Sequence, residues 1–141
     1  MILLDTNVVS ELMRPGPAGV VLGWFDHQEA SNLFLSTISE AELRAGVAVL
    51  PAGRRRERLL AAVEAVVVQD FAGRLLPFDS AAARAYAAIY AARRAAGRPI
   101  AEADCQIAAI AACRGFAVAT RNVGDFTGCG VDVVAPWRQP A

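Results

Sequence analysis

The chain opens with Met1-Ile2-Leu3-Leu4-Asp5-Thr6-Asn7-Val8, a short apolar run followed by three polar residues. Consecutive apolar side chains indicate a strand that is buried on both faces, as in a parallel sheet. Asp, Thr and Asn all favour the N-terminus of a helix. The segment therefore predicts a strand over residues 2–4 that leads into a helix over residues 8–13.

The same alternation of strand and helix continues through the chain. Apolar runs at residues 33–36, 75–78, 116–119 and 131–134 predict further strands. Between them, helical spacing and capping residues predict helices over residues 18–29, 39–50, 54–68, 79–97 and 102–114. We expect an α/β fold: a single domain over residues 1–141, with a mostly parallel central β-sheet flanked by helices.

Composition places the chain among globular proteins. Hydrophobic residues make up 55% and the mean hydropathy is +0.36, well above the range of disordered chains. No apolar run approaches the roughly 18–20 residues needed to span a bilayer. The opening segment has no basic region followed by a long apolar stretch, so we do not expect a secretory signal. We expect a cytoplasmic protein without membrane association.

The residue types exclude several classes of chemistry. All fourteen basic residues are Arg, so a Walker A loop and a Schiff-base site, which need Lys, are excluded. His27 alone cannot build a His-rich zinc site. Cys105, Cys113 and Cys129 lack metal-type pairing and are expected to be buried, reduced thiols. Carboxylate, hydroxyl, amide and guanidinium groups remain for catalysis or binding.

Arginines form two local clusters in a chain of zero net charge. One is Arg54-Arg55-Arg56 with Arg58, and the other is Arg93-Arg94 with Arg98. Either cluster is a solvated helix face or a contact for a phosphate backbone. The sequence leaves both interpretations open.

Acidic residues lie where predicted strands and helices meet. Asp5 follows the first strand, Glu42 lies in the first turn of the helix after the second strand, and Asp104 begins a later helix. In open α/β sheets the ligand crevice lies at the carboxyl ends of the strands. We therefore expect the three acids to converge at one edge of the sheet.

Each acid also has a purely structural interpretation. Asp5 can be a helix cap, and Ser39-x-x-Glu42 has the spacing of a capping box. Asp104, in a first helical turn, is favoured by the helix dipole. Together, however, neighbouring carboxylates repel one another unless a cation lies among them. A hard divalent ion, Mg²⁺ or Mn²⁺, suits ligands that are all oxygen.

Four motifs in order resemble those of PIN-domain proteins, in particular VapC-like toxins of the FitB-like branch. The first is the opening segment with Asp5, and the second is Ser39-Glu40-Ala41-Glu42-Leu43-Arg44-Ala45-Gly46. The third runs from Ile100 to Ala109 and contains Asp104; the fourth is Ala119-Thr120-Arg121-Asn122-Val123-Gly124-Asp125-Phe126. The closing Val134-Ala135-Pro136-Trp137 also resembles this branch. In the fourth motif Asn122 stands where many members have Asp, so Asp125 is the other candidate for the fourth acid.

The resemblance implies an Mg²⁺- or Mn²⁺-dependent endoribonuclease that acts as the toxin of a type II toxin–antitoxin pair. Asp5, Glu42 and Asp104 would hold the metal, partly through waters, with Asp125 completing the site. Thr6 and Thr120 would orient carboxylates by hydrogen bonds, and a metal-activated water would attack the RNA phosphodiester.

The same resemblance implies two protein partners, a second copy of the chain and an antitoxin. The high apolar fraction also favours a homodimer, and the alanine-rich helix Ala81–Ala96, with Ala88 and Ala91 one turn apart, is a candidate interface. A cognate antitoxin is expected to cover the acids and to place an Arg among them, because guanidinium matches paired carboxylates.

Two other functions would also use an acid after the first strand or a PIN-like fold. A phosphatase with Asp5 as nucleophile would need an acid at Asn7 and a Lys, and the chain has neither. A PIN-like module that binds protein or RNA without catalysis would be indicated by loss of a core acid. All three acids are present, which favours the nuclease.

Overall fold

A five-stranded, wholly parallel sheet organises the molecule, with strand order β3-β2-β1-β4-β5. The computed structural model describes residues 1–138. Within them the strands are short: β1 (Ile2–Leu4), β2 (Leu33–Ser36), β3 (Leu75–Leu76), β4 (Ala117–Ala119) and β5 (Val133–Val134). The prediction of an α/β fold with a parallel central sheet is confirmed.

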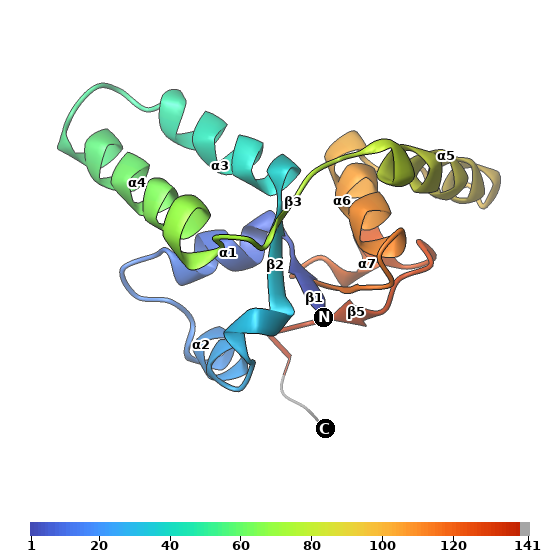
Figure 1. Cartoon of the computed structure of the whole chain (residues 1–141), viewed down its shortest axis with the longest axis horizontal. Coiled ribbons are helices and arrows are strands. Elements are labelled where there is room, and N and C mark those ends of the chain that lie inside the picture. Colours follow the sequence, from blue (N-terminus) through green and yellow to red (C-terminus); the bar gives the residue numbers. More distant parts are fainter. Residues whose placement is uncertain (139–141) are drawn as a thin grey trace.

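In the described part of the chain, seven α-helices connect and cover the strands (Figure 1). They are α1 (Thr6–Leu12), α2 (Gly19–Asp26), α3 (Thr37–Ala48), α4 (Arg54–Glu64), α5 (Ser80–Ala95), α6 (Glu102–Ala112) and α7 (Val123–Phe126). A 3-10 turn (Ala30–Asn32) precedes β2, and a π-helical segment (Ala65–Asp70) extends α4. No helix in residues 1–138 has both the length and the apolar character needed to cross a bilayer.

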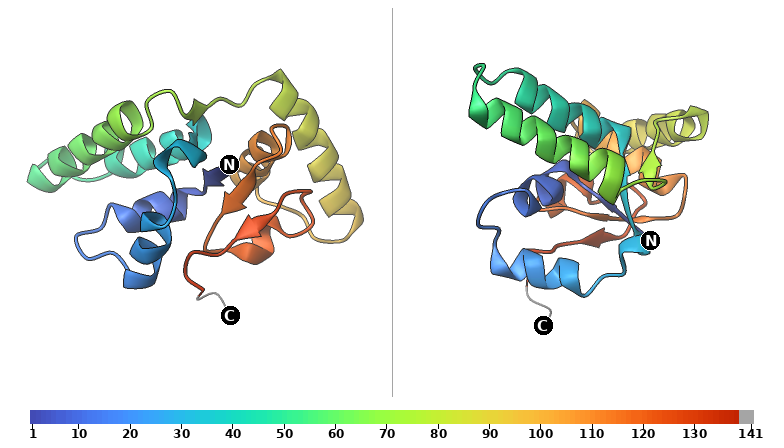
Figure 2. Two further views of the ribbon diagram at one scale, coloured as in Figure 1. Left: turned by 60° about the horizontal axis from the view of Figure 1, so that its bottom comes forward. Right: turned by 60° about the vertical axis from the view of Figure 1, so that its left-hand side comes forward.

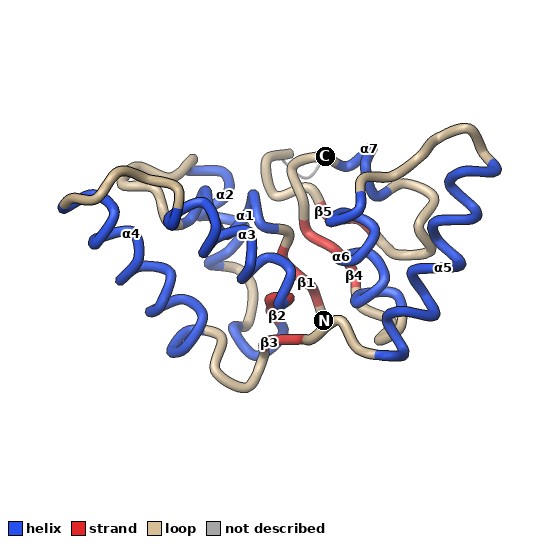
Figure 3. The backbone as a smooth tube through the Cα atoms, turned by 90° about the horizontal axis from the view of Figure 1, so that it is seen from above, coloured by secondary structure: helices blue, strands red, loops and turns tan. Residues whose placement is uncertain are grey.

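The sheet separates two hydrophobic cores because successive side chains of a strand point to opposite faces. Leu3 and Val118 pack in the core made with α5, α6 and α7, whereas Leu4 and Ala119 pack in the core made with α1, α3 and α4. Seen from above in Figure 3, helices α1–α4 lie on one side of the strands and α5–α7 on the other. Both views of Figure 2 show α3 and α4 running side by side.

The starts of two helices differ from the prediction. Asp5 caps α1, which begins at Thr6 and so includes the polar residues that were expected to precede it. Helix α3 begins at Thr37, because Ser36 is its cap and accepts a hydrogen bond from the Ser39 amide at 3.0 Å. The predicted capping box was therefore wrong: Ser39 lies inside the helix, and Glu42 lies in the second turn rather than the first.

The cysteines follow the prediction only in part. All three are free thiols, and Cys105 and Cys129 are buried in the core beneath α6. Cys113 is exposed, so the expectation that all three are buried was wrong for this residue. It follows the last residue of α6, beyond the apolar face of that helix.

The central strand gives a test of the core. Leu4 is fully buried, so Leu4→Ala removes a packed side chain and leaves a cavity; we expect a loss of ~2–5 kcal/mol in the free energy of unfolding. Val49 is 82% exposed, and Val49→Ala is the control, expected within about 0.5 kcal/mol of wild type. Urea unfolding followed by circular dichroism measures both, and equal losses would contradict this description of the core.

Candidate metal-binding site

The topology brings two strand ends together at the middle of the sheet. From β1 the chain proceeds to β2 and β3 on one side, and then crosses to β4 and β5 on the other. This change of direction lies between β1 and β4, where α/β proteins bind their ligands. Asp5 directly follows β1 and Thr120 directly follows β4, and the Asp5 amide donates to the Ala119 carbonyl at 2.8 Å.

Asp5 is a buried carboxylate with a hydrogen bond to each oxygen. Its Oδ1 accepts from the Thr6 amide at 2.7 Å, and its Oδ2 accepts from the Thr120 hydroxyl at 2.8 Å. Thr120 is fully buried, and its oxygen also accepts from the Asn122 amide at 3.0 Å. Burial raises the pKa of Asp5 above its ordinary value, although both hydrogen bonds act in the opposite direction.

Glu42 is tied to α1 through Thr6. The Thr6 hydroxyl lies 2.7 Å from Glu42 Oε1 and 2.8 Å from Ser39 Oγ. A hydroxyl has one hydrogen to donate, and the carboxylate is the stronger acceptor. Thr6 therefore holds two neighbouring groups at once: its amide binds Asp5 and its hydroxyl binds Glu42.

Asp104 reaches the same place from the other face of the sheet. It lies in the first turn of α6, half-buried, and its pKa is raised to about 6. Burial is the largest cause, followed by the negative charges of Asp5, Asp125 and Glu42, while the positive charge of Arg93 acts against them. Four carboxylates from four different segments therefore lie within electrostatic reach of one another.

The loop after β4 carries both candidates for the fourth acid. Asn122 precedes α7 but makes no side-chain cap bond, and Asp125 lies inside this four-residue helix. Asp125 therefore lies within the helix and not at its N-cap. Its charge raises the pKa of both Asp5 and Asp104, so α7 directs this acid toward the site.

These donors fit a hydrated hard cation. Asp5, Glu42 and Asp104 offer oxygen atoms only, the ligands that Mg²⁺ and Mn²⁺ prefer. Within residues 1–138, no three acidic, histidine or cysteine side chains lie near enough to one another to enclose an ion directly. Mg²⁺ commonly keeps several waters, so an ion bridged to the acids through water matches this wider spacing.

A cavity of 640 Å³ extends from the acids between α1, α3 and α4. Thr6 and Glu42 line its end nearest the site, and apolar side chains such as Leu43, Val47 and Leu59 line much of the rest. Three arginines also line it: Arg14, Arg55 and Arg58. Two residues of the first predicted arginine cluster, Arg55 and Arg58, therefore line the same cavity as Glu42.

The second arginine cluster differs from the prediction. Arg94 and Arg98 are exposed, but Arg93 is only 7% exposed and faces the core. It is not available to a phosphate. Helical periodicity could have indicated this, since Arg93 follows the buried Ile89 by four residues, on one face of α5.

Ser39 is a second residue whose place the sequence did not indicate. Its side chain is fully buried and contacts the Thr6 hydroxyl that binds Glu42. The pattern Ser39-x-x-Glu42 hid this arrangement, because it is also the pattern of a capping box. No other signal in a single sequence separates the two.

Comparison with known proteins agrees with this geometry. The model of the PIN domain matches residues 2–126. Three relatives, each aligned over 98% of this chain and 99% of its own length, are plasmid stability protein StbB of Pseudomonas syringae pv. tomato at 49% identity, VapC ribonuclease Y4jK of Sinorhizobium fredii at 47%, and toxin FitB of Neisseria gonorrhoeae at 44%.

Among solved structures, a FitAB complex bound to a DNA fragment superposes with a TM-score of 0.94 at 42% identity. The match covers 100% of this chain and 99% of the matched chain. The motifs carrying Asp5, Glu42 and Asp104 thus lie in a chain that resembles these proteins over its whole length. The chain belongs to the PIN-domain family and, within it, to the VapC- and FitB-like proteins of toxin–antitoxin systems.

Proposed function

We propose that this protein is a divalent-metal-dependent endoribonuclease and the toxin of a toxin–antitoxin pair. The observation that carries the proposal is the convergence of Asp5, Glu42 and Asp104 where β1 and β4 meet. Burial, and after it the negative charges of the neighbouring acids, raises the pKa of Asp5 and of Asp104. The identity of 47% to a VapC ribonuclease supports the same activity.

Each residue of the site has a role in the proposed reaction. Asp5, Glu42 and Asp104 would hold a hydrated Mg²⁺ or Mn²⁺, and Asp125 would add a fourth carboxylate from α7. The bound ion would polarise the scissile phosphate and make a nearby water more acidic. Thr6 and Thr120 fix the carboxylates by the hydrogen bonds described above, and a carboxylate of the cluster orients the attacking water or accepts its proton.

RNA would reach the acids as a single strand or a loop, because the phosphate must come close to the metal. The acids alone repel a phosphate backbone. Arg14, Arg55 and Arg58 line the cavity next to Glu42 and can attract the flanking phosphates. We place the protein in the cytoplasm, where its RNA substrate is found.

A protein partner would silence the enzyme by covering the same acids. The FitAB match, and the resemblance to toxin families, favour a cognate antitoxin. An arginine of that partner, inserted among Asp5, Glu42 and Asp104, would relieve their repulsion in place of the metal. The cavity beside Glu42 offers apolar side chains for the rest of the segment.

A homodimer is the second proposed assembly. Large apolar side chains remain exposed on several helices, and they include Leu60 and Tyr90. On α5, Ala88 and Ala91 are both exposed, so their small side chains would allow a second helix to approach closely. The α5 surface is therefore the proposed contact.

The proposal is tested by Asp104→Asn, which keeps the shape of the side chain and removes its charge. We expect ribonuclease activity on a mixed RNA substrate in Mg²⁺ or Mn²⁺ to fall to background, and growth inhibition on expression to disappear. Asp132→Asn is the matched control, because Asp132 precedes β5 and so lies at the amino ends of the strands. Full activity of the Asp104 variant would favour a binding module without catalysis.

The raised pKa of Asp104 gives a prediction for the metal-free protein. The pKa of Asp104 is about 6 in the folded state and near 3.8 in the unfolded state, so the folded state binds this proton more tightly. The free energy of unfolding therefore decreases as the pH rises from about 4 to about 6. In EDTA, Asp104→Asn should be at least as stable as wild type at pH 7–8, and the difference should close below pH 4. Thermal unfolding across this pH range measures it; a less stable variant at pH 8 would indicate a structural role.

The fourth acid is tested by a pair of variants in the loop after β4. Asp125→Asn should lower turnover at least about tenfold, equivalent to ~1.4 kcal/mol of activation free energy, with little change in binding of the first metal. Asn122→Ala should have a smaller effect, because an amide oxygen is a weaker ligand. Steady-state cleavage and metal titration by calorimetry give the two quantities. If the order of the two variants is reversed, Asn122 is the fourth site residue.

A further inference from the structure

We infer that Arg93 is a positioning residue for the catalytic site: its buried guanidinium fixes the backbone of α7 and so directs Asp125 toward the other acids. The inference rests on the proposed function, in which Asp125 is the fourth acid. It concerns a residue in the last turn of α5, outside the four motifs that indicate the family.

Arg93 binds two loops at once. Its Nη1 donates to the carbonyls of Asp125 and Thr127, both at 2.9 Å, and contacts Cys129 Sγ at 3.5 Å. Its Nε donates to the carbonyl of Arg98 at 2.7 Å. One side chain therefore joins the end of α7 to the turn that connects α5 and α6.

The buried positive charge of Arg93 is stabilised by backbone carbonyl groups. The side chain is only 7% exposed, and within residues 1–138 no carboxylate forms an ion pair with it. A buried cation without a counterion is unfavourable unless dipoles replace water around it. Carbonyl oxygens at the end of α7 and beyond α5 supply such dipoles. A planar group with several fixed donors is needed to reach all of them, and Arg provides it.

Asp125 depends on this contact because α7 has few other constraints. The helix has four residues and lacks a side-chain cap, and the Asp125 side chain itself is exposed. Phe126 anchors it through the core, and Arg98 donates to the Gly124 carbonyl at 3.3 Å. The Asp125 amide donates to the Asn122 carbonyl at 3.0 Å within the same short segment, whereas Arg93 bonds the Asp125 carbonyl from α5. Removal of Arg93 would therefore loosen the attachment of Asp125 to the rest of the fold and let the acid turn away from the site.

A purely structural role for Arg93 makes a different prediction. In that case its loss would weaken the whole fold, and the effect on activity would be independent of Asp125. If Arg93 acts through Asp125, removing Arg93 should do little more once the carboxylate of Asp125 is already gone. A double-mutant cycle separates the two cases.

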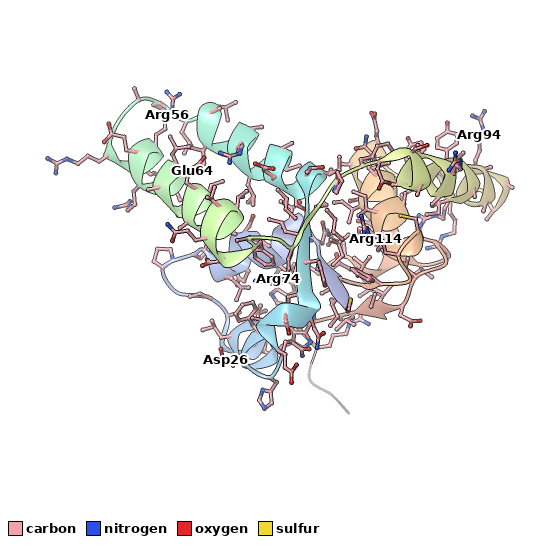
Figure 4. All side chains as sticks on the ribbon, viewed as in Figure 1. Asp26, Arg56, Glu64, Arg74, Arg94 and Arg114 are labelled. Atoms are coloured by element: carbon pink, nitrogen blue, oxygen red, sulfur yellow. The ribbon has the colours of Figure 1, made fainter. Side chains whose placement is uncertain are left out.

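The experiment compares Arg93→Met, Arg93→Lys, Asp125→Asn and the double variant Arg93→Met/Asp125→Asn. Arg94→Met is the matched control, because Arg94 is the next residue, is exposed on α5, and its guanidinium contacts the Tyr90 hydroxyl (Figure 4). Cleavage kinetics in Mg²⁺ are measured together with hydrogen–deuterium exchange of amides 122–129 in metal-free buffer. Circular dichroism and urea unfolding establish that each variant is folded.

We expect Arg93→Met to lower kcat about tenfold, like Asp125→Asn, with KM unchanged, and the double variant to resemble Asp125→Asn alone. Arg93→Lys should recover part of the loss. Exchange of amides 122–129 should rise in both Arg93 variants and not in Arg94→Met.

Other results overturn the inference. If the two losses multiply in the double variant, if exchange of the loop is unchanged, or if neither Arg93 variant folds, Arg93 is not a positioning residue. Full activity of Asp125→Asn beside an inactive Asp104→Asn also overturns it, while the proposed function stands. Failure of the proposed function itself is recognised separately, by wild-type protein that cleaves no RNA in either metal.

Discussion

The position of one buried carboxylate, Asp5, constrains the rest of the site. It lies where the chain leaves the central strand, its amide is bound by β4, and its two oxygens are bound by Thr6 and Thr120. Neither hydrogen bond neutralises the negative charge. Asp5 is thus fixed in place next to the sheet, and its negative charge can still be compensated by a cation.

The other acids are arranged around Asp5 by separate parts of the fold. Glu42 is bound through Thr6 on the α1 and α3 face, whereas Asp104 arrives from α6 on the opposite face. Because these helices pack into different cores, each acid is held in place by its own set of packing contacts. The electrostatic repulsion among these carboxylates destabilises the folded state. A divalent ion or an inserted guanidinium would relieve this repulsion.

The sequence predicted the architecture well because the strands are short, apolar and regularly alternated with capped helices. It also identified Asp5, Glu42 and Asp104 as residues that converge, since parallel strands place their carboxyl ends at one edge. The predictions from sequence were wrong where one sequence pattern is compatible with two different structures. Ser39-x-x-Glu42 fits a capping box, but Ser36 caps the helix instead. Arg93 fits a surface cluster by composition, and only the register of α5 shows that it faces inward.

Arg93 and the arginines of the cavity act on the cluster of carboxylates in different ways. Arg14, Arg55 and Arg58 line the same cavity as Glu42, so they can meet a phosphate that enters it. Arg93 is buried instead, and its guanidinium donates to the carbonyls of Asp125 and Thr127. Its positive charge lowers the pKa of Asp104, against the burial that raises it, and Arg93 does not occupy the space where the proposed metal would bind. Had this positive charge instead formed an ion pair with one of the acids, it would have competed with the metal, as an antitoxin arginine is proposed to do. A guanidinium that is held by backbone dipoles moderates the repulsion and leaves the carboxylates free.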